Sequence, residues 1–212
     1  MTKKIKITPP KLTHDLLPGN FDELEHDAYY TNTLFQDCSL SDVSFEKVCF
    51  KNVAFVNVTF ENCQFHQIEL LDVTFEKCNI SNTEMIEAII QRAQFANTKF
   101  LGTNFAEASI MDTTFTECFG NYGSFSYASL KRVCFTKTSL IESDFFEIKW
   151  QHLFFEKCEL DGANFMQTNM KGLNLSSSTF DRIAISTDLL KGSILNAGQA
   201  LVIAGALGIQ IE

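Results

Sequence analysis

The residues of this chain best suited to chemistry are carboxylates, and Glu142, Glu159 and Asp161 form their densest group. Carboxylates on the wall of a protein can act as catalytic acids and bases. The four histidines are scattered, and none has a predicted nucleophile partner of the Ser-His-Asp kind. The ten glycines are dispersed and form no phosphate-binding loop. Because exposed carboxylates on a solvated face need no function, we predict a protein that is not an enzyme and uses no cofactor.

A five-residue period must position these side chains, and it runs from Tyr30 to Leu195. Seventeen of the 21 phenylalanines fall on multiples of five, and Gly120 is the clear gap in the series. Helices repeat every 3.6 residues and strands every two, so this period fits neither element. The pattern instead predicts a repeat architecture.

A second column of small or β-branched residues stands two positions before each large residue, as Val53 stands before Phe55. Residues two apart in an extended chain point the same way, so each pentapeptide offers one small and one large inward group. The chain must then turn a corner before the next pair. Quarter turns predict a square tube of about 20 residues per coil, with coils stacked roughly 4.8 Å apart.

The seven cysteines could suggest disulfides or a metal site, but the register argues against both. Five occupy the inward small position: Cys38, Cys63, Cys78, Cys118 and Cys158. Four of these recur every two coils, which places them roughly 9–10 Å apart, too far for a disulfide or a shared metal. We predict buried thiols that act as small hydrophobes. Cys49 and Cys134 fall on outward positions and are expected to be free thiols.

The period divides the chain into three segments. Residues 1–29 are predicted to be an N-terminal lead-in and cap, residues 30–195 the repeat shaft, and residues 196–212 a C-terminal helix and strand for dimerisation. All three prolines lie within the first 18 residues, where they do not interrupt the coil-to-coil ladder. Residues 21–30 are expected to form a short helix that covers the first coil.

The C-terminal segment is predicted to begin with Asn196 as a helix cap and to end its helix at Gly208. A short strand could follow at residues 209–211. A solenoid cap that faces water should be polar outside, so this apolar end favours a two-fold dimer. The expected dimerisation residues are Ala200, Leu201, Ile203, Ala204, Leu207, Ile209 and Ile211.

Charge is distributed unequally when 20 residues are assigned to each coil. The wall centred on residues 50, 70 and 90 is net positive, whereas the walls centred on 40, 60 and 80 and on 45, 65 and 85 are net acidic. The formal net charge of −9 argues against direct nucleic-acid binding. Two adjacent acidic faces could instead imitate a phosphate ridge, although an acidic protein shows some asymmetry anyway. The candidate binding carboxylates are Asp42, Glu61, Glu84, Glu87, Glu107, Glu142, Asp144, Glu147, Glu159 and Asp161.

Two irregular places interrupt the pattern. Phe119 precedes the gap at Gly120 and is expected to turn inward, which would be a packing adjustment rather than a recognition site. Phe146, Trp150 and Phe154 place additional aromatic rings around one coil. An apolar strip is expected where Phe146 lies above Met166.

The repeat units resemble those of the pentapeptide repeat family, as in SDVSF, KNVAF, ENCQF, LDVTF, LGTNF, SYASL and DGANF. The resemblance covers about 165 residues, and the register is held throughout. It implies an all-β protein, a right-handed quadrilateral parallel β-helix with a short C-terminal helix.

The last residues, NAGQALVIAGALGIQI, are similar to the ending of Qnr-type quinolone-resistance proteins. The Qnr and MfpA groups are dimeric rods that bind DNA gyrase, imitate duplex DNA and protect the enzyme from fluoroquinolones. The resemblance therefore implies a homodimer with DNA gyrase as partner, and topoisomerase IV as a second target left open. The five-residue phase is unbroken, so the chain resembles the loopless Gram-positive members or MfpA.

Two hypotheses remain from the sequence: a gyrase-protecting DNA mimic, and a scaffold that binds another protein with its acidity incidental. A third, an enzyme on a β-helix wall, would need an activity that is lost on replacing Glu142 or Asp161. No signal peptide is visible, and the apolar stretch at 200–211 is too short to span a bilayer. We expect a cytoplasmic protein without a membrane partner.

Overall fold

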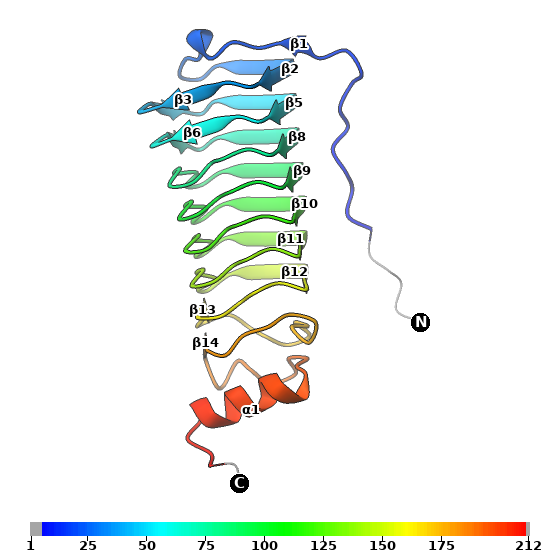
Figure 1. Cartoon of the computed structure of the whole chain (residues 1–212), viewed down its shortest axis with the longest axis vertical. Helices are drawn as coiled ribbons and strands as arrows, with labels where there is room; N and C mark the ends of the chain where they lie inside the picture. Colours follow the sequence, from blue (N-terminus) through cyan, green and yellow to red (C-terminus); the bar gives the residue numbers. More distant parts are fainter. Residues whose placement is uncertain (1–5, 211–212) are drawn as a thin grey trace.

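The chain forms a parallel β-solenoid of about eight coils, closed at its lower end by one short helix (Figure 1). The computed structural model describes residues 6–210. Long strands build the main sheet, in the order β1 (Leu17–Pro18), β2 (Tyr29–Gln36), β5 (Cys49–Val56), β8 (Glu69–Glu76), β9 (Ile89–Ala96), β10 (Ser109–Thr116), β11 (Ser129–Thr136) and β12 (Lys149–Glu156). Short strands pair on the other walls: β3 (Ser39–Ser41) with β6 (Thr59–Glu61), β4 (Ser44–Glu46) with β7 (Gln64–His66), and β13 (Ala163–Phe165) with β14 (Ile183–Ile185).

The predicted coil of 20 residues is confirmed by the strand register, which pairs Phe35 with Phe55 and Phe115 with Phe135. Side chains at the large inward position stack in the core. The ring centroids of Phe75 and Phe95 lie 4.7 Å apart, and those of Phe95 and Phe115 lie 4.6 Å apart. The core is therefore a continuous column in which each coil packs on its neighbours.

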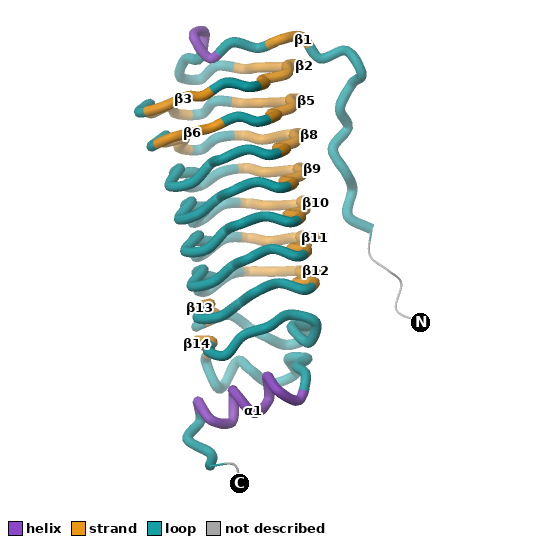
Figure 2. Tube along the Cα trace, viewed as in Figure 1, coloured by secondary structure: helices purple, strands orange, loops and turns teal. Residues whose placement is uncertain are grey.

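The corners of the coil are formed by the residue two positions after each large centre. From residue 27 to residue 172 these residues adopt a left-handed conformation, with φ between 51° and 61° for the non-glycine members. Asn and Asp tolerate this conformation better than most residues. Because the bend recurs every five residues and a coil has 20, corner residues form columns spaced by one coil. The Cα trace shows the stacked coils (Figure 2).

The upper end is covered by a smaller element than predicted. Residues 21–30 form only one 3-10 turn, η1 (Phe21–Glu23), before β2 begins at Tyr29. The side chain of Asn20 caps this turn by accepting from the Asp22 N–H. The ring of Phe21 stacks on Phe35 at a centroid distance of 4.4 Å, and so it closes the core column with an aromatic surface.

The N-terminal segment doubles back and runs beside the shaft from the level of β1 toward the level of β10 (Figure 1). Residues 6–16, here called the N-terminal strap, contain no regular element. The backbone N–H groups of Thr13, Lys11 and Thr8 donate to side chains on successively lower coils. The lead-in is thus attached to a corner of the shaft.

The lower end is closed by helix α1 (Ala197–Ala206). The predicted cap is confirmed: Asn196 accepts from the Gln199 N–H, and the Gln199 side chain accepts from the Asn196 N–H. Gln199 also donates to the carbonyl oxygens of Leu175 and Ser178, which fastens the helix to the last coil. Ile209 and Gln210 form no strand, and Ile211 lies outside the described residues.

The gap at Gly120 is filled by a neighbour rather than by Phe119. A Cβ atom at Gly120 would lie 1.9 Å from the ring of Phe100, so that ring occupies the missing side-chain volume. Phe119 is 54% exposed, and the expectation that it turns inward is wrong. No helix within residues 6–210 is long and apolar enough to cross a bilayer.

Candidate protein-interaction surface

Four of the predicted carboxylates lie on one side of the shaft and are here called the free acidic face, in which the exposed Tyr127 separates Glu107 from Glu147: Glu84, Glu87, Glu107 and Glu147. Glu87, Glu107 and Glu147 occupy one corner column, with φ of 57°, 60° and 51°. Glu87 and Glu107 stand on adjacent coils, so roughly 4.8 Å of rise separates their backbones. The Gln67 amide donates to Glu87 at 2.5 Å, and no cationic side chain pairs with any of the four in the described chain.

Asp144 lies on the same wall but is committed to the shaft itself. Its carboxylate accepts from the Ser126 hydroxyl at 2.8 Å, from the Asn164 amide at 2.9 Å and from the Phe146 N–H at 3.0 Å. A partner would have to compete with these three donors. We therefore separate Asp144 from the free acidic face and assign it a structural role.

Two carboxylates of the neighbouring acidic wall share one arginine. Arg182 pairs with Glu142 at 3.0 Å and with Asp161 at 3.1 Å, and so it joins coils that are 40 residues apart in sequence. The hydrogen bond from Arg182 and the Asp181 N–H hold the pKa of Asp161 below its ordinary value. Glu159 accepts from the Ser139 hydroxyl at 2.8 Å. The densest group of carboxylates in the sequence is thus a network of structural contacts.

Higher on this wall, Asp42 accepts from the Asn62 amide at 3.2 Å, and Glu61 is exposed. Both lie one or more coils above the free acidic face. The predicted residues therefore divide into the free acidic face, the exposed Glu61, and a set held by Arg182 and neighbouring polar groups.

The corner beside the positive wall has a different organisation, which the sequence did not reveal. Asp72 pairs with Arg92 through two bonds of 2.6 Å, and Asp112 pairs with Arg132 through bonds of 2.7 and 2.5 Å. The strap adds a donor to each acid: Lys11 N–H reaches Asp72 at 3.0 Å, and Thr8 N–H reaches Asp112 at 3.1 Å. We call this arrangement the strapped corner.

The pKa values of these two aspartates are lowered by their surroundings. For Asp72, burial opposes ionisation, but the hydrogen bonds from Arg92 and the Lys11 N–H outweigh it. For Asp112, the hydrogen bond from Arg132 is the main cause, and the Thr8 N–H contributes in the same direction. A signal was present in the sequence, because Asp72 and Arg92 are 20 residues apart, as are Asp112 and Arg132.

The thiols and possible metal ligands are unsuited to chemistry. All seven cysteines are free, and burial raises the pKa of Cys63, Cys78, Cys118 and Cys158 to about 11. Such thiols stay protonated at neutral pH and are poor nucleophiles. Cys49, expected on the outside, is buried. Within residues 6–210 no group of three or more His, Cys, Asp or Glu side chains could hold a metal ion.

Helix α1 presents two faces of different character. Ile203 is 6% exposed and packs into the core of its own chain, so it is unavailable to a second copy. Leu201, Leu207 and Ile209 are 54%, 49% and 56% exposed. Ala200 is also exposed, and Ala204 is half-buried. The expected dimerisation residues thus lie partly on a capping face and partly on an apolar outer face.

The coil geometry agrees with known protein families. Residues 88–165 match the family described as Pentapeptide repeat region, and residues 151–182 match Pentapeptide repeats (8 copies). Residues 88–182 thus carry the pentapeptide repeats that these two models describe. Residues 20–105 are similar to the SV2A/B/C luminal domain. No match was found among curated proteins.

Several solved structures are similar to this chain. Two trypsin-treated forms of QnrB1, a plasmid-mediated fluoroquinolone resistance protein, are 18% and 17% identical, with TM-scores of 0.48 and 0.43. The alignments cover 88% and 84% of this chain, and 92% and 100% of those chains. A pentapeptide repeat protein from the Arabidopsis thaliana thylakoid lumen is 18% identical, with a TM-score of 0.41 and coverage of 42% of this chain and 63% of that one. We draw no functional argument from these likenesses.

Proposed function

We propose that this protein is a dimeric rod that binds DNA gyrase where the enzyme would otherwise hold DNA, and protects the enzyme from fluoroquinolones. The free acidic face carries the proposal. Glu87, Glu107 and Glu147 are exposed along one corner column, Glu84 is half-buried beside it, and no cation of the described chain pairs with the four. The similarity of residues 196–211 to the ending of Qnr-type proteins supports the choice of partner.

Charge would act on the approach of the two proteins as well as on their contact. A face of one sign steers an oppositely charged partner and raises the association rate, and salt weakens this effect. The formal net charge of −9 extends the attraction beyond the contact itself. The binding needs no chemical step, since a rigid acidic surface can occupy a DNA-binding surface by shape and charge.

The direct test is DNA supercoiling by purified gyrase with this protein titrated in, both with and without a fluoroquinolone. The proposal predicts that supercoiling in the presence of the drug is restored at low protein concentration. A parallel decatenation assay with topoisomerase IV decides whether the second enzyme is also a target. Absence of both rescue and inhibition of gyrase would leave a scaffold for another protein.

Charge reversal locates the contact surface. We expect the combined substitutions Glu84→Lys, Glu87→Lys, Glu107→Lys and Glu147→Lys to weaken gyrase binding at least about a hundredfold, since each tenfold corresponds to about 1.4 kcal/mol. Glu76→Lys with Glu156→Lys is the control on a different wall, where both residues are exposed, and Glu87→Lys with Glu107→Lys is the variant that matches it in charge. Equal losses in these two double variants would show that only net charge matters, and unchanged affinity in the fourfold variant would refute the assigned face.

The dimer is proposed to form through the outer face of α1. Leu201→Glu with Leu207→Glu should leave the cap intact, because Gln199 and Ile203 make the contacts with the shaft. Light scattering should then report one chain of 23.9 kDa instead of two. Lys191→Glu adds a carboxylate outside α1 and should leave the dimer unchanged. A wild-type monomer across micromolar concentrations would exclude this interface.

A further inference from the structure

The regular ladder of the main sheet ends at β12, and a tryptophan side chain lies at the break. No backbone hydrogen bond within the described chain joins β12 to residues 169–176. The indole Nε1–H of Trp150 donates instead to the Asn169 carbonyl oxygen at 2.7 Å. Elsewhere that position of the coil accepts a backbone N–H, as when Phe145 N–H donates to Asn164 at 2.7 Å. The side chain of Trp150 thus replaces one backbone hydrogen bond of the ladder and keeps β12 apart from the coil below it.

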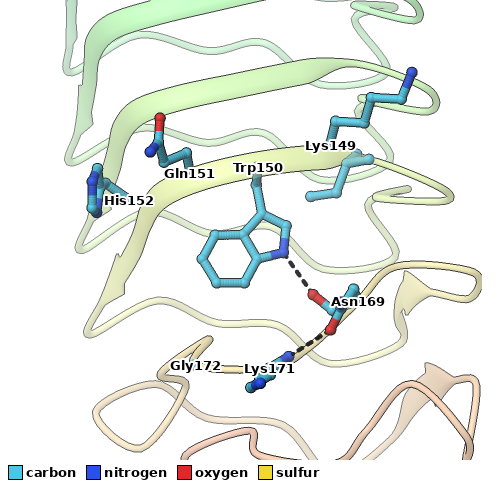
Figure 3. A pocket seen from close by; sticks show the side chains of 8 residues that line it. Lys149, Trp150, Gln151, His152, Asn169, Lys171 and Gly172 are labelled. Carbon is cyan, nitrogen blue, oxygen red and sulfur yellow. Dashed lines mark hydrogen bonds between the residues drawn. The ribbon is translucent and has the colours of Figure 1, made fainter.

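The separated coils enclose an open hollow of about 630 Å³, with the indole on one side (Figure 3). Lys149 comes from β12, and Lys171 comes from the coil below. Gly172 lies on the lower rim of the hollow. A Cβ atom built there would have no other atom within 4 Å, so the rim is open at this residue. This volume lies in the range of small-molecule sites, about 300–1,000 Å³.

The charge of the hollow is of one sign. No carboxylate lines it, and neither Lys149 nor Lys171 forms an ion pair in the described structure. Lys131 lies one coil above and borders the neighbouring hollow together with Lys149 and Trp150. The hollow therefore combines a flat apolar surface with two unpaired lysines at its rim, of which Lys149 points away from the indole and has to turn toward it to reach a ligand (Figure 3).

We propose that this hollow binds a flat aromatic anion, with its ring against the indole of Trp150 and its carboxylate or sulfonate between Lys149 and Lys171. Offset aromatic stacking and charge-assisted hydrogen bonds would act together at one site. The site adjoins the free acidic face, since Glu147 lies two residues before Lys149, but its chemistry does not rest on gyrase binding.

The test uses calorimetric titration of the full-length protein with 2-naphthoate. Two further probes separate the contributions: 2-naphthamide has the ring without the charge, and inorganic phosphate has the charge without the ring. We expect one naphthoate per chain at sub-millimolar affinity, and at least tenfold weaker binding of each other probe, where tenfold corresponds to about 1.4 kcal/mol. Trp150 is the one tryptophan of the chain, so its fluorescence should change along the same titration.

Variants place the bound anion. Lys149→Gln and Lys171→Gln should each weaken naphthoate binding about tenfold, or about 1.4 kcal/mol. Both side chains are exposed, so folding should be unaffected. Lys99→Gln on another wall and Leu201→Glu on the apolar face of α1 should change nothing. Affinity that is unchanged in the lysine variants, lost in Leu201→Glu, or equal for naphthamide would overturn the proposal, as would the absence of saturable binding.

Discussion

The strapped corner and the free acidic face use the same backbone position, yet only one of them neutralises its acids. Asp72 and Asp112 stand in one left-handed column, and Glu87 and Glu107 stand in another. Below each aspartate, one coil away, is an arginine, whereas Glu87 is followed by Glu107. The residue 20 positions further on therefore decides whether a corner acid is structural or available to a partner.

The strap strengthens this difference. It supplies a backbone N–H to both aspartates and to Asn52, which also donates from its amide to the Thr13 hydroxyl at 2.8 Å. Asp72 and Arg92 retain 10% and 23% exposure of their side chains. The charges of Asp72 and Arg92 therefore have their partners within the chain. Those of the free acidic face have water as their main partner.

The largest expected difference between the two corners is in stability. Asp72→Ala removes the acceptor of Arg92 and of the Lys11 N–H, and it should lower the free energy of unfolding by about 1.5–3 kcal/mol. Glu107→Ala, at the equivalent position of the other corner, should change it by less than about 0.5 kcal/mol. Denaturant unfolding followed by circular dichroism measures both. Equal losses of stability in the two variants would mean that the strap and Arg92 do not stabilise the corner.

The second difference is in the pH dependence of stability. The folded-state pKa values of Asp72 and Asp112 lie below their ordinary values, so the stabilisation is present above the unfolded pKa, about 3.9. It is lost as the pH falls through the lower folded-state values. Stability of the wild type should therefore fall more steeply below pH about 4 than that of the Asp72→Asn, Asp112→Asn variant. Asn52 shows that an amide accepts a strap N–H in this column. Parallel curves for the two proteins would contradict the assignment.

The sequence predicted the features that recur, because each depends on near neighbours in the chain. The five-residue period predicted the coil and the inward columns, and Asn196 predicted the helix start. The strap depends on contacts between residues 39 to 104 positions apart and has no periodic signal. Arg182 reaches Glu142 two coils away, and the net charge of a wall does not predict such a contact. Trp150 holds a central position but lies between coils, since an indole N–H needs an acceptor when it is half-buried.

The smallest expected effect on stability comes from a substitution that gives the free acidic face an ion pair between adjacent coils, as in the strapped corner. Gln67 stands one coil above Glu87, and Gln67→Lys places a cation there in a left-handed position that Lys47 already occupies in the same column. The new pair is exposed, so it should add only about 0.2–1 kcal/mol to the free energy of unfolding. This gain should vanish in 1 M salt, where the Debye length is about 3 Å. The same substitution should weaken gyrase binding, because the cation offsets part of the charge that the partner would meet. A gain that persists in high salt would show that the lysine acts by packing, and the corners would then differ in shape rather than in charge.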